Sequence, residues 1–296
     1  SAVNLPWSTT YDCNDWTQSM GLYNVNCDGL RGDGAWTTND GREEQITSAA
    51  NYSGGSGGKG QRHWMGDGVN NVSGGLGISF TSSQSELWIR WYMRYENGFR
   101  WVNLNNQKIL YINVLGQNAV IVQYVWSDQV RIASRDYSGY YESPAGNGWR
   151  TIMGGDASDG RWHLYEVHLK TDTNGNNGIA EMWIDGTQRI SVSNANFGST
   201  GFDYILIGSN GFEPNNGRTM YIDFDDIMIN GIAVSTGSGG SENSDSSSGG
   251  GCGIVKNISN KPKQAIGQIA LNLLILLLPL FLIEIWQLKK KGLVCK

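Results

Sequence analysis

The segment 161–186, RWHLYEVHLKTDTNGNNGIAEMWIDG, most constrains how this chain can fold. Apolar and polar side chains alternate over 162–170 and again over 179–185, which is the period of half-buried strands. Between these runs, 172–178 is dense in Asn, Asp and Gly, the residues that tolerate the positive φ angles of turns. The segment therefore predicts a β-hairpin with a long connection, followed by an Asp-Gly turn.

The connection also holds Asp172, Asn174 and Asn176, which are side chains typical of calcium loops. The spacing departs from the helix-loop-helix pattern, because Gly178 falls one place late and Trp183 stands where a bidentate Glu is needed. We therefore interpret the segment as a plain turn and expect neither a cofactor nor a metal site. A structural calcium elsewhere in the domain stays open.

Composition indicates an all-β domain. The 296 residues include 41 Gly, 5 Pro, 12 Trp and 13 Tyr, which fits many short strands joined by tight turns and suggests exposed aromatic platforms. The net charge of −5 argues against nucleic acid as a partner. A polyanionic partner would need a local basic groove against this background.

The strand expected at 86–95, ELWIRWYMRY, separates into two faces because side chains alternate. The apolar face is Leu87, Ile89, Trp91 and Met93, and we expect it to lie in a core. The other face stacks aromatic rings and guanidinium groups: Trp88, Arg90, Tyr92 and Arg94. Such a face can bind a sugar chain, with C–H surfaces on the rings and hydroxyl or carboxylate groups on Arg. An equally open alternative is that the Arg stems cover the sheet and pair with Glu86 and Glu96.

The order Trp-His, strand, polar turn and Trp-x-Asp-Gly in 162–186 resembles laminin-G-like and concanavalin-A-like jelly rolls. The closing strand at 220–230, MYIDFDDIMING, is similar to theirs too, and its alternation places Met228 with Ile222 and Phe224 on the core face. The resemblance implies a two-sheet antiparallel β-sandwich over 1–234, with one concave sheet open to a polysaccharide or other glycan. Taking the non-core faces together, the candidate carbohydrate-binding residues are Trp88, Arg90, Tyr92, Arg94, Tyr111, Glu166 and Trp183.

This fold hosts binding proteins and enzymes alike, so the resemblance does not determine whether the chain is an enzyme. Polysaccharide lyases of the fold neutralise a uronate carboxylate and move a proton with Tyr or His. The candidate catalytic residues are Arg42, His168 and Tyr221. GREEQIT lacks the second Arg of an alginate-lyase-type motif, and QKILYIN has no His. Three functions stay open: carbohydrate recognition, a lyase acting on uronate-containing glycans, and a structural or adhesive surface subunit.

Cys13 and Cys27 bracket a short polar segment, and we expect them to form a disulfide, which requires an oxidising compartment. The sequence starts at Ser1 without an apolar leader, so we interpret it as a mature form after signal-peptide removal. Both observations predict an extracellular protein.

The composition changes sharply after Val234. We expect a Gly/Ser-rich linker at 235–251, a juxtamembrane segment at 252–264, a transmembrane or sorting helix at 265–288 and a basic cytoplasmic tail at 289–296. The Gly-rich motif around Cys252, the apolar run and the Lys cluster resemble bacterial C-terminal sorting signals. This resemblance implies a cell-surface protein processed by a membrane sorting protease, and a permanent single-pass anchor is the alternative.

Overall fold

A computed structural model of the chain describes residues 2–33, 44–65, 72–100, 106–113, 119–125, 127–211 and 220–234. These residues lie in one compact unit, Ser1–Gly237. The predicted linker, juxtamembrane segment, helix and basic tail at 235–296 fall outside the described residues. Among the helices that are described, none is long and apolar enough to cross a membrane.

The regular secondary structure of the described residues is almost entirely β-strand, as composition predicted. The strands are β1 (Ala2–Val3), β2 (Trp7–Thr9), β3 (Trp16–Thr17), β4 (Arg31–Asp33), β5 (Gln45–Thr47), β6 (Gly60–Trp64), β7 (Val72–Tyr95), β8 (Asn106–Ile112), β9 (Val120–Val125), β10 (Gln129–Ser134), β11 (Gly139–Glu142), β12 (His163–Lys170), β13 (Gly178–Ile184), β14 (Thr187–Ala195), β15 (Phe202–Gly211) and β16 (Tyr221–Ala233). The helices are the 3₁₀ turns η1 (Gln18–Met20) and η2 (Ser48–Ala50) and the short α1 (Trp149–Met153).

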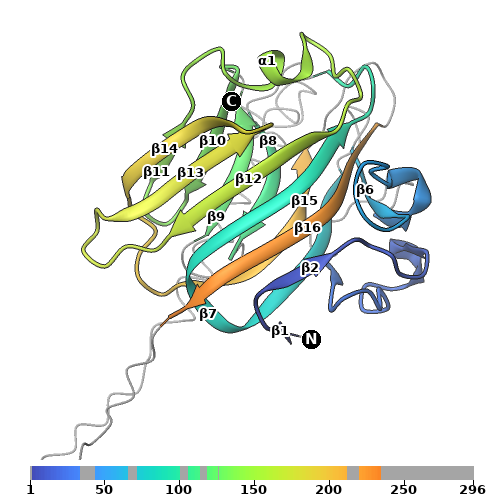
Figure 1. Ribbon diagram of the computed structural model, residues 1–296, viewed down its shortest axis with the longest axis horizontal. Coiled ribbons are helices and arrows are strands. Elements are labelled where there is room, and N and C mark those ends of the chain that lie inside the picture. The colour runs from blue at the N-terminus through green and yellow to red at the C-terminus, as the bar shows by residue number, and fades with distance from the viewer. Residues whose placement is uncertain are drawn as a thin grey trace, which may run out of the picture. The chain divides into compact units, whose positions relative to one another are not determined.

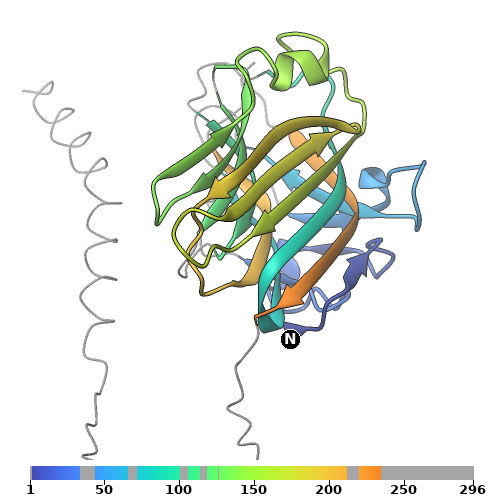
Figure 2. The same cartoon turned by 60° about the vertical axis from the view of Figure 1, so that its left-hand side comes forward.

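The long strand β7 belongs to both layers of a sandwich. Its first half, 72–79, pairs with β15, and its second half, 86–93, pairs with β12 and β16. We call the layer β14-β13-β12-β7-β16-β6-β5-β3 sheet 1, and the layer β11-β10-β9-β8-β15-β7 sheet 2. Figure 1 shows the central strands of sheet 1 in front of sheet 2, and Figure 2 shows the two layers from the side. The pairing is antiparallel except for β1, which joins β7 in parallel. The predicted antiparallel β-sandwich is therefore confirmed.

The hairpin predicted from the segment 161–186 is present. Strands β12 and β13 pair in register from Tyr165 opposite Ile184 to Lys170 opposite Ile179. The next turn joins β13 to β14 through Asp185 and Gly186, whose φ angles are 51° and 73°. Two consecutive positive φ angles are characteristic of the two-residue hairpin turn, which explains why Asp-Gly stands there.

The core fills the space between the two sheets. The face of β7 predicted to be apolar is buried, and Trp91 is only 1% exposed and stacks on Tyr165 with ring centroids 5.3 Å apart. The Tyr165 hydroxyl forms a 2.6 Å hydrogen bond with the hydroxyl of Tyr124 on β9. This bond joins sheet 1 to sheet 2 through the middle of the core, where an unpaired hydroxyl would be costly.

Strand β16 contains a β-bulge that the sequence pattern did not indicate. Asp225 lies opposite Tyr92 and Met228 lies opposite Arg90, so Asp226 and Ile227 together face a single residue of β7. Asp226 has a φ of 47°, a conformation that Asp tolerates better than most residues. The extra residue reverses the alternation, so Ile227 is buried and Met228 is 44% exposed on the outer face. The prediction that Met228 lies on the core face is therefore wrong.

Cys13 and Cys27 form the predicted disulfide, with Cα atoms 5.5 Å apart. Together with Asp28 they are also the one group of at least three His, Cys, Asp or Glu side chains close enough to hold a metal among the described residues. Because both sulfur atoms are used in the disulfide, this group offers no thiolate ligand.

Candidate functional site

Two rows of side chains cross the outer face of sheet 1, because residues directly opposite each other on neighbouring strands share a face. The first row, from β16 to β13, is Met228, Arg90, Glu166 and Trp183. The second row, two residues further along each strand, is Asn230, Trp88, His168 and Glu181. The predicted residues Trp88, Arg90, Glu166 and Trp183 are therefore neighbours in space although they come from three strands.

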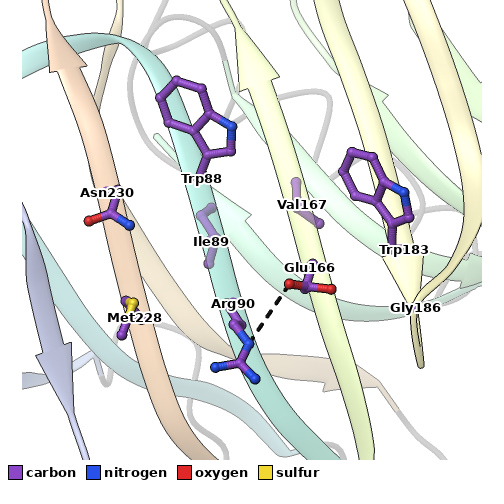
Figure 3. A pocket seen from close by; sticks show the side chains of 9 residues that line it. All are labelled: Trp88, Ile89, Arg90, Glu166, Val167, Trp183, Gly186, Met228 and Asn230. Atoms are coloured by element: carbon purple, nitrogen blue, oxygen red, sulfur yellow. Dashed lines mark ion pairs between the residues drawn. The ribbon is translucent and has the colours of Figure 1, made fainter.

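The first row, together with Trp88 and Asn230 of the second, lines a hollow of about 400 Å³. Figure 3 shows the Trp88 and Trp183 rings rising from β7 and β13, with Arg90 below Trp88 on the same strand, Glu166 on the strand between β7 and β13, and Met228 and Asn230 on the β16 side. A second hollow of about 450 Å³ adjoins the first, since Arg90 and Met228 line both. It continues past Tyr92 to the β2 residues Ser8 and Thr9 and the loop residues Gly54, Gly55 and Ser56. We call the two hollows together the Trp88 groove.

Arg90 and Glu166 form a loose ion pair at the centre of the groove. The Arg90 Nε atom lies 3.8 Å from a Glu166 carboxylate oxygen, and the two side chains are 45% and 39% exposed. An ion pair this long and this exposed contributes little to stability. Both groups can therefore turn towards a ligand at small cost.

His168 is held by two carboxylates. Its Nδ1 lies 2.7 Å from an oxygen of Glu181, its Nε2 lies 2.7 Å from an oxygen of Glu86, and its ring stacks on Trp88. Both ring nitrogens are therefore engaged with carboxylate oxygens of the protein itself. In this arrangement neither nitrogen is available to take a proton from a substrate, so His168 supports the Trp88 ring.

Arg94 lies on the predicted face but belongs to a structural cluster. Arg94 and Arg62 both donate to Asp223, with N–O distances of 2.8–3.0 Å, and both donate to the carbonyl oxygen of Ala49 at 3.0 Å. Burial raises the pKa of Asp223, while the two guanidinium groups act in the opposite direction. The prediction that Arg94 lines the open groove is wrong, because η2 and the loop after it cover this end of the sheet.

The same loop covers Tyr92 and Asp225. The Tyr52 ring stacks on Tyr92 with centroids 4.1 Å apart, and the Tyr52 backbone N–H donates to Asp225 at 2.7 Å. Burial raises the pKa of Asp225 to about 7, although the N–H groups of Tyr52 and Asp226 lower it. Tyr92 thus borders the Trp88 groove with one ring face already occupied by Tyr52.

Tyr111 does not belong to this site. It lies on β8 in sheet 2, is 2% exposed, and packs with Ile121, Ala133 and Leu206. Its alternation was interpreted correctly as pointing away from the main core. The assignment of Tyr111 to the same face as Trp88 is wrong because β8 lies in sheet 2. Alternation within a strand does not indicate which sheet that strand joins.

The catalytic candidates are not brought together by the described structure. Tyr221 lies beneath the Arg62 guanidinium at the far end of β16. His168 pairs with Trp88 while Ile222, next to Tyr221, pairs with Tyr95, so the two residues are separated by roughly 25 Å along the sheet at ~3.3 Å per residue. Arg42 lies outside the described residues, as does Cys252.

The sequence interpretation missed Met228 and Asn230, which form the β16 side of the groove. Both were displaced by the bulge at Asp226. The one local indication was the Asp225-Asp226 pair, which interrupts the alternation of apolar and polar residues in the strand, since Asp and Asn are enriched among residues that adopt positive φ.

The connection of the β12–β13 hairpin is a hydrogen-bonded turn. Asp172 is 3% exposed and accepts hydrogen bonds from the backbone N–H groups of Gly175, Phe197 and Gly198. Asn174 accepts the N–H of Asn176, so the candidate calcium oxygens serve the turn itself. This geometry favours the plain turn.

No family model matches the chain. No curated protein matches it either. Among solved structures, the chain is similar to a double mutant of the alginate lyase Aly36B in complex with alginate tetrasaccharide, with 15% identity, a TM-score of 0.50, and 79% of this chain and 99% of that chain covered. A second mutant of that lyase, in complex with alginate trisaccharide, matches with 15% identity and a TM-score of 0.50 over 77% of this chain and 99% of that chain. The cellulose-induced protein Cip1 matches with 14% identity and a TM-score of 0.49 over 75% of this chain and 95% of that chain. At this identity, the likeness to the lyase structures shows a shared jelly-roll fold.

Proposed function

We propose that this protein is an extracellular carbohydrate-recognising jelly-roll protein, and that the Trp88 groove binds a sugar chain. The observation that carries the proposal is the diagonal placement of Trp88 and Trp183 across Arg90 and Glu166. The two Trp residues are two strands and two residues apart, which is roughly 12 Å from strand spacing and rise. Two indole rings beside a half-exposed Arg–Glu pair match a chain of sugar rings with hydroxyl groups along its edges.

The charges that line the groove favour a neutral sugar chain. Arg90 is its one cation among the described lining residues, and Glu166 and Asp226 are its anions. Because these charges do not sum to a positive field, the groove offers an acidic chain no long-range attraction.

The test first measures binding of the full chain, in mild detergent, to an array of neutral and acidic glycans. Each glycan that binds is then used in affinity electrophoresis, where it slows the migration of the protein. We expect Trp88→Ala and Trp183→Ala each to weaken retention by a neutral glycan several-fold. The matched control is Tyr23→Ala, an exposed aromatic residue outside the groove. Retention that is unchanged in both Trp variants would overturn the proposal.

A polysaccharide lyase is the second candidate, and a single observation favours it. Arg90 and Tyr92 lie side by side in the groove, with an Arg90 Nη2 to Tyr92 hydroxyl distance of 3.4 Å. A uronate carboxylate on Arg90 would leave the phenol close to the neighbouring carbon. Incubation with alginate and pectate, followed by ultraviolet absorbance of unsaturated products, decides between the two. Activity in the wild type that is lost in Tyr92→Phe would support the lyase, and no product would support a binding protein.

We also propose that the tail places the protein on the cell surface. The support is the order of a Gly-rich motif at Cys252, an apolar run at 269–283 and the lysines at 289–291. Intact-mass measurement of protein taken from its native cell separates the two versions of this proposal. Loss of the residues beyond about Cys252 indicates processing by a sorting protease, and retention through Lys296 indicates a permanent anchor. Recovery of the intact protein from the culture fluid alone would contradict both. A third role, as an adhesive or structural surface subunit, is favoured by no particular observation within the described residues.

A further inference from the structure

The outer face of sheet 2 carries its own ordered rows of side chains, on the opposite side of the sandwich from the Trp88 groove. One row crosses β8 to β11 and consists of residues that lie directly opposite one another: Lys108, Gln123, Arg131 and Glu142. The neighbouring row crosses β15 to β11: Leu206, Tyr111, Ile121, Ala133 and Tyr140. Because opposite residues share a face, both rows point away from the core.

Aromatic rings and apolar side chains make the floor of this face. Tyr111, Ile121, Ala133 and Leu206 form a cluster separate from the main core, and Tyr204 packs against it. The Tyr204 side chain lies over Gly77, where an added Cβ would come within 2.1 Å of the phenol oxygen. Gly77 is therefore required for the ring position. At the far edge, Tyr140 is 64% exposed.

Four cations surround this floor: Arg31, Lys108, Arg131 and Arg135. The Arg31 guanidinium lies 5.2 Å from the centre of the Tyr204 ring, and that of Arg131 lies 4.5 Å from the centre of the Tyr140 ring. Arg131 pairs with Glu142 at 2.5 Å. Among the described residues, Arg31, Lys108 and Arg135 form no ion pair. This face is thus locally positive although the whole chain carries a charge of −5.

Lys108 lies close to the ring of Tyr111. Its ammonium group lies 5.8 Å from the centre of the Tyr111 ring, and it is partly buried. Burial lowers the pKa of Lys108, and the positive charge of Arg135 acts in the same direction. A partly buried cation beside a like charge is held at a cost in free energy, and an anion bound between the two would reverse that cost.

We propose that this face, bounded by Arg31, Lys108, Arg131 and Arg135, is a second carbohydrate surface, and that it binds an anionic polysaccharide bearing carboxylate or sulfate groups. Lys108 and Arg131 are two strands apart, roughly 10 Å, so the cations match charges repeated along a chain better than one small anion. Tyr140, which is 64% exposed, and the partly exposed Tyr204 provide stacking surfaces for sugar rings at the two edges of this face. The proposal is independent of the Trp88 groove, which lies on the other sheet and lacks this excess of positive charge.

The test uses the full chain in mild detergent, with affinity electrophoresis through gels containing polygalacturonate, heparin or neutral dextran. We expect retention by at least one anionic polymer, decreasing as salt is added because the contacts are ionic. The double variant Arg31→Gln/Arg135→Gln should lose most of this retention, and Lys108→Gln should weaken it several-fold. The double variant's melting temperature should stay close to wild type, since neither side chain has an ion partner to lose.

The matched control is Arg161→Gln, which removes an exposed arginine outside both surfaces. Trp88→Ala and Trp183→Ala should leave retention by the anionic polymer unchanged, so failure of the groove and failure of this face are distinguishable. The proposal is overturned if no anionic polysaccharide is retained at low salt, or if Arg161→Gln reduces retention as much as the double variant. Retention of single-stranded nucleic acid in preference to every polysaccharide would also overturn it.

Discussion

His168 lies flat against Trp88, with ring centroids 4.7 Å apart and ring planes 6° apart. The histidine is fixed in turn by Glu86 and Glu181, so the indole at the edge of the groove rests on a ring with little freedom to rotate. A binding surface that is ordered before the ligand arrives loses less entropy on binding. His168, a catalytic candidate in the sequence, is thus held by Glu86 and Glu181 against the Trp88 ring, and under the proposed function it would position that ring for a ligand.

The two faces of β7 should respond differently to truncation. Trp88→Ala should change the free energy of unfolding by no more than about 1 kcal/mol, because it loses one stacking contact at a partly exposed site. Trp91→Ala should cost about 3–5 kcal/mol, because it leaves a large cavity in the core. Urea unfolding of both variants measures the difference. Equal losses would contradict the separation of the faces.

The Asp223 cluster should be structural. Asp223→Ala removes the carboxylate that Arg62 and Arg94 share and should destabilise the fold by about 3–5 kcal/mol, since two partly buried cations lose their partner. Glu166→Gln, at the exposed pair with Arg90, is the control and should cost less than about 1 kcal/mol. Thermal unfolding compares the two. If Asp223→Ala were as stable as the wild type but retained glycan less, the structural role of the cluster would be contradicted and Arg94 would be assigned to the binding site.

Asp225 should make stability fall as pH rises. Its pKa is about 7 in the folded protein, above the value of about 3.9 expected in the unfolded chain. Between these values the folded state holds a proton that the unfolded state has lost, so this contribution is complete below about pH 4 and is lost as pH rises through about 7. Asp225→Asn removes this pH-dependent contribution. As pH rises from 5 to 8, the free energy of unfolding of the variant should therefore increase relative to that of the wild type. A constant difference across this range would contradict the assignment.

The disulfide should stabilise the amino-terminal segment. Cys13 and Cys27 are separated by 14 residues, and closing a loop of this length is worth about 3 kcal/mol. Reduction, or the variant Cys13→Ser/Cys27→Ser, should lower stability by about that amount. Peptide mapping under non-reducing conditions provides the direct check, since the two cysteines should be recovered in one linked pair. Free, alkylated Cys13 in the native protein would contradict the bond.

The features predicted correctly depend on neighbours within a few residues. Alternation in 86–95 separated Trp88 from Trp91, and the Asp-Gly pair at 185–186 identified the turn after β13. Both follow from the two-residue repeat of a strand and from the small number of residues that adopt positive φ. The disulfide belongs with them, because a loop of 14 residues is closed locally.

Local patterns in the sequence were therefore sufficient to predict the strands at 86–95 and in the 161–186 hairpin, and which side chains of 86–95 face the core. Tertiary structure alone decided which faces meet. Tyr111 lies on sheet 2 because β8 pairs with β9 and β15. Met228 lies beside Arg90 because one extra residue at Asp226 switches the faces to which the following side chains of β16 point. Arg94 is not available to a ligand because its guanidinium group donates a hydrogen bond to the carbonyl oxygen of Ala49, in the turn η2 more than forty residues earlier. The physical reason is that pairing and coverage are set by contacts between distant segments, whereas alternation is a property of a single strand.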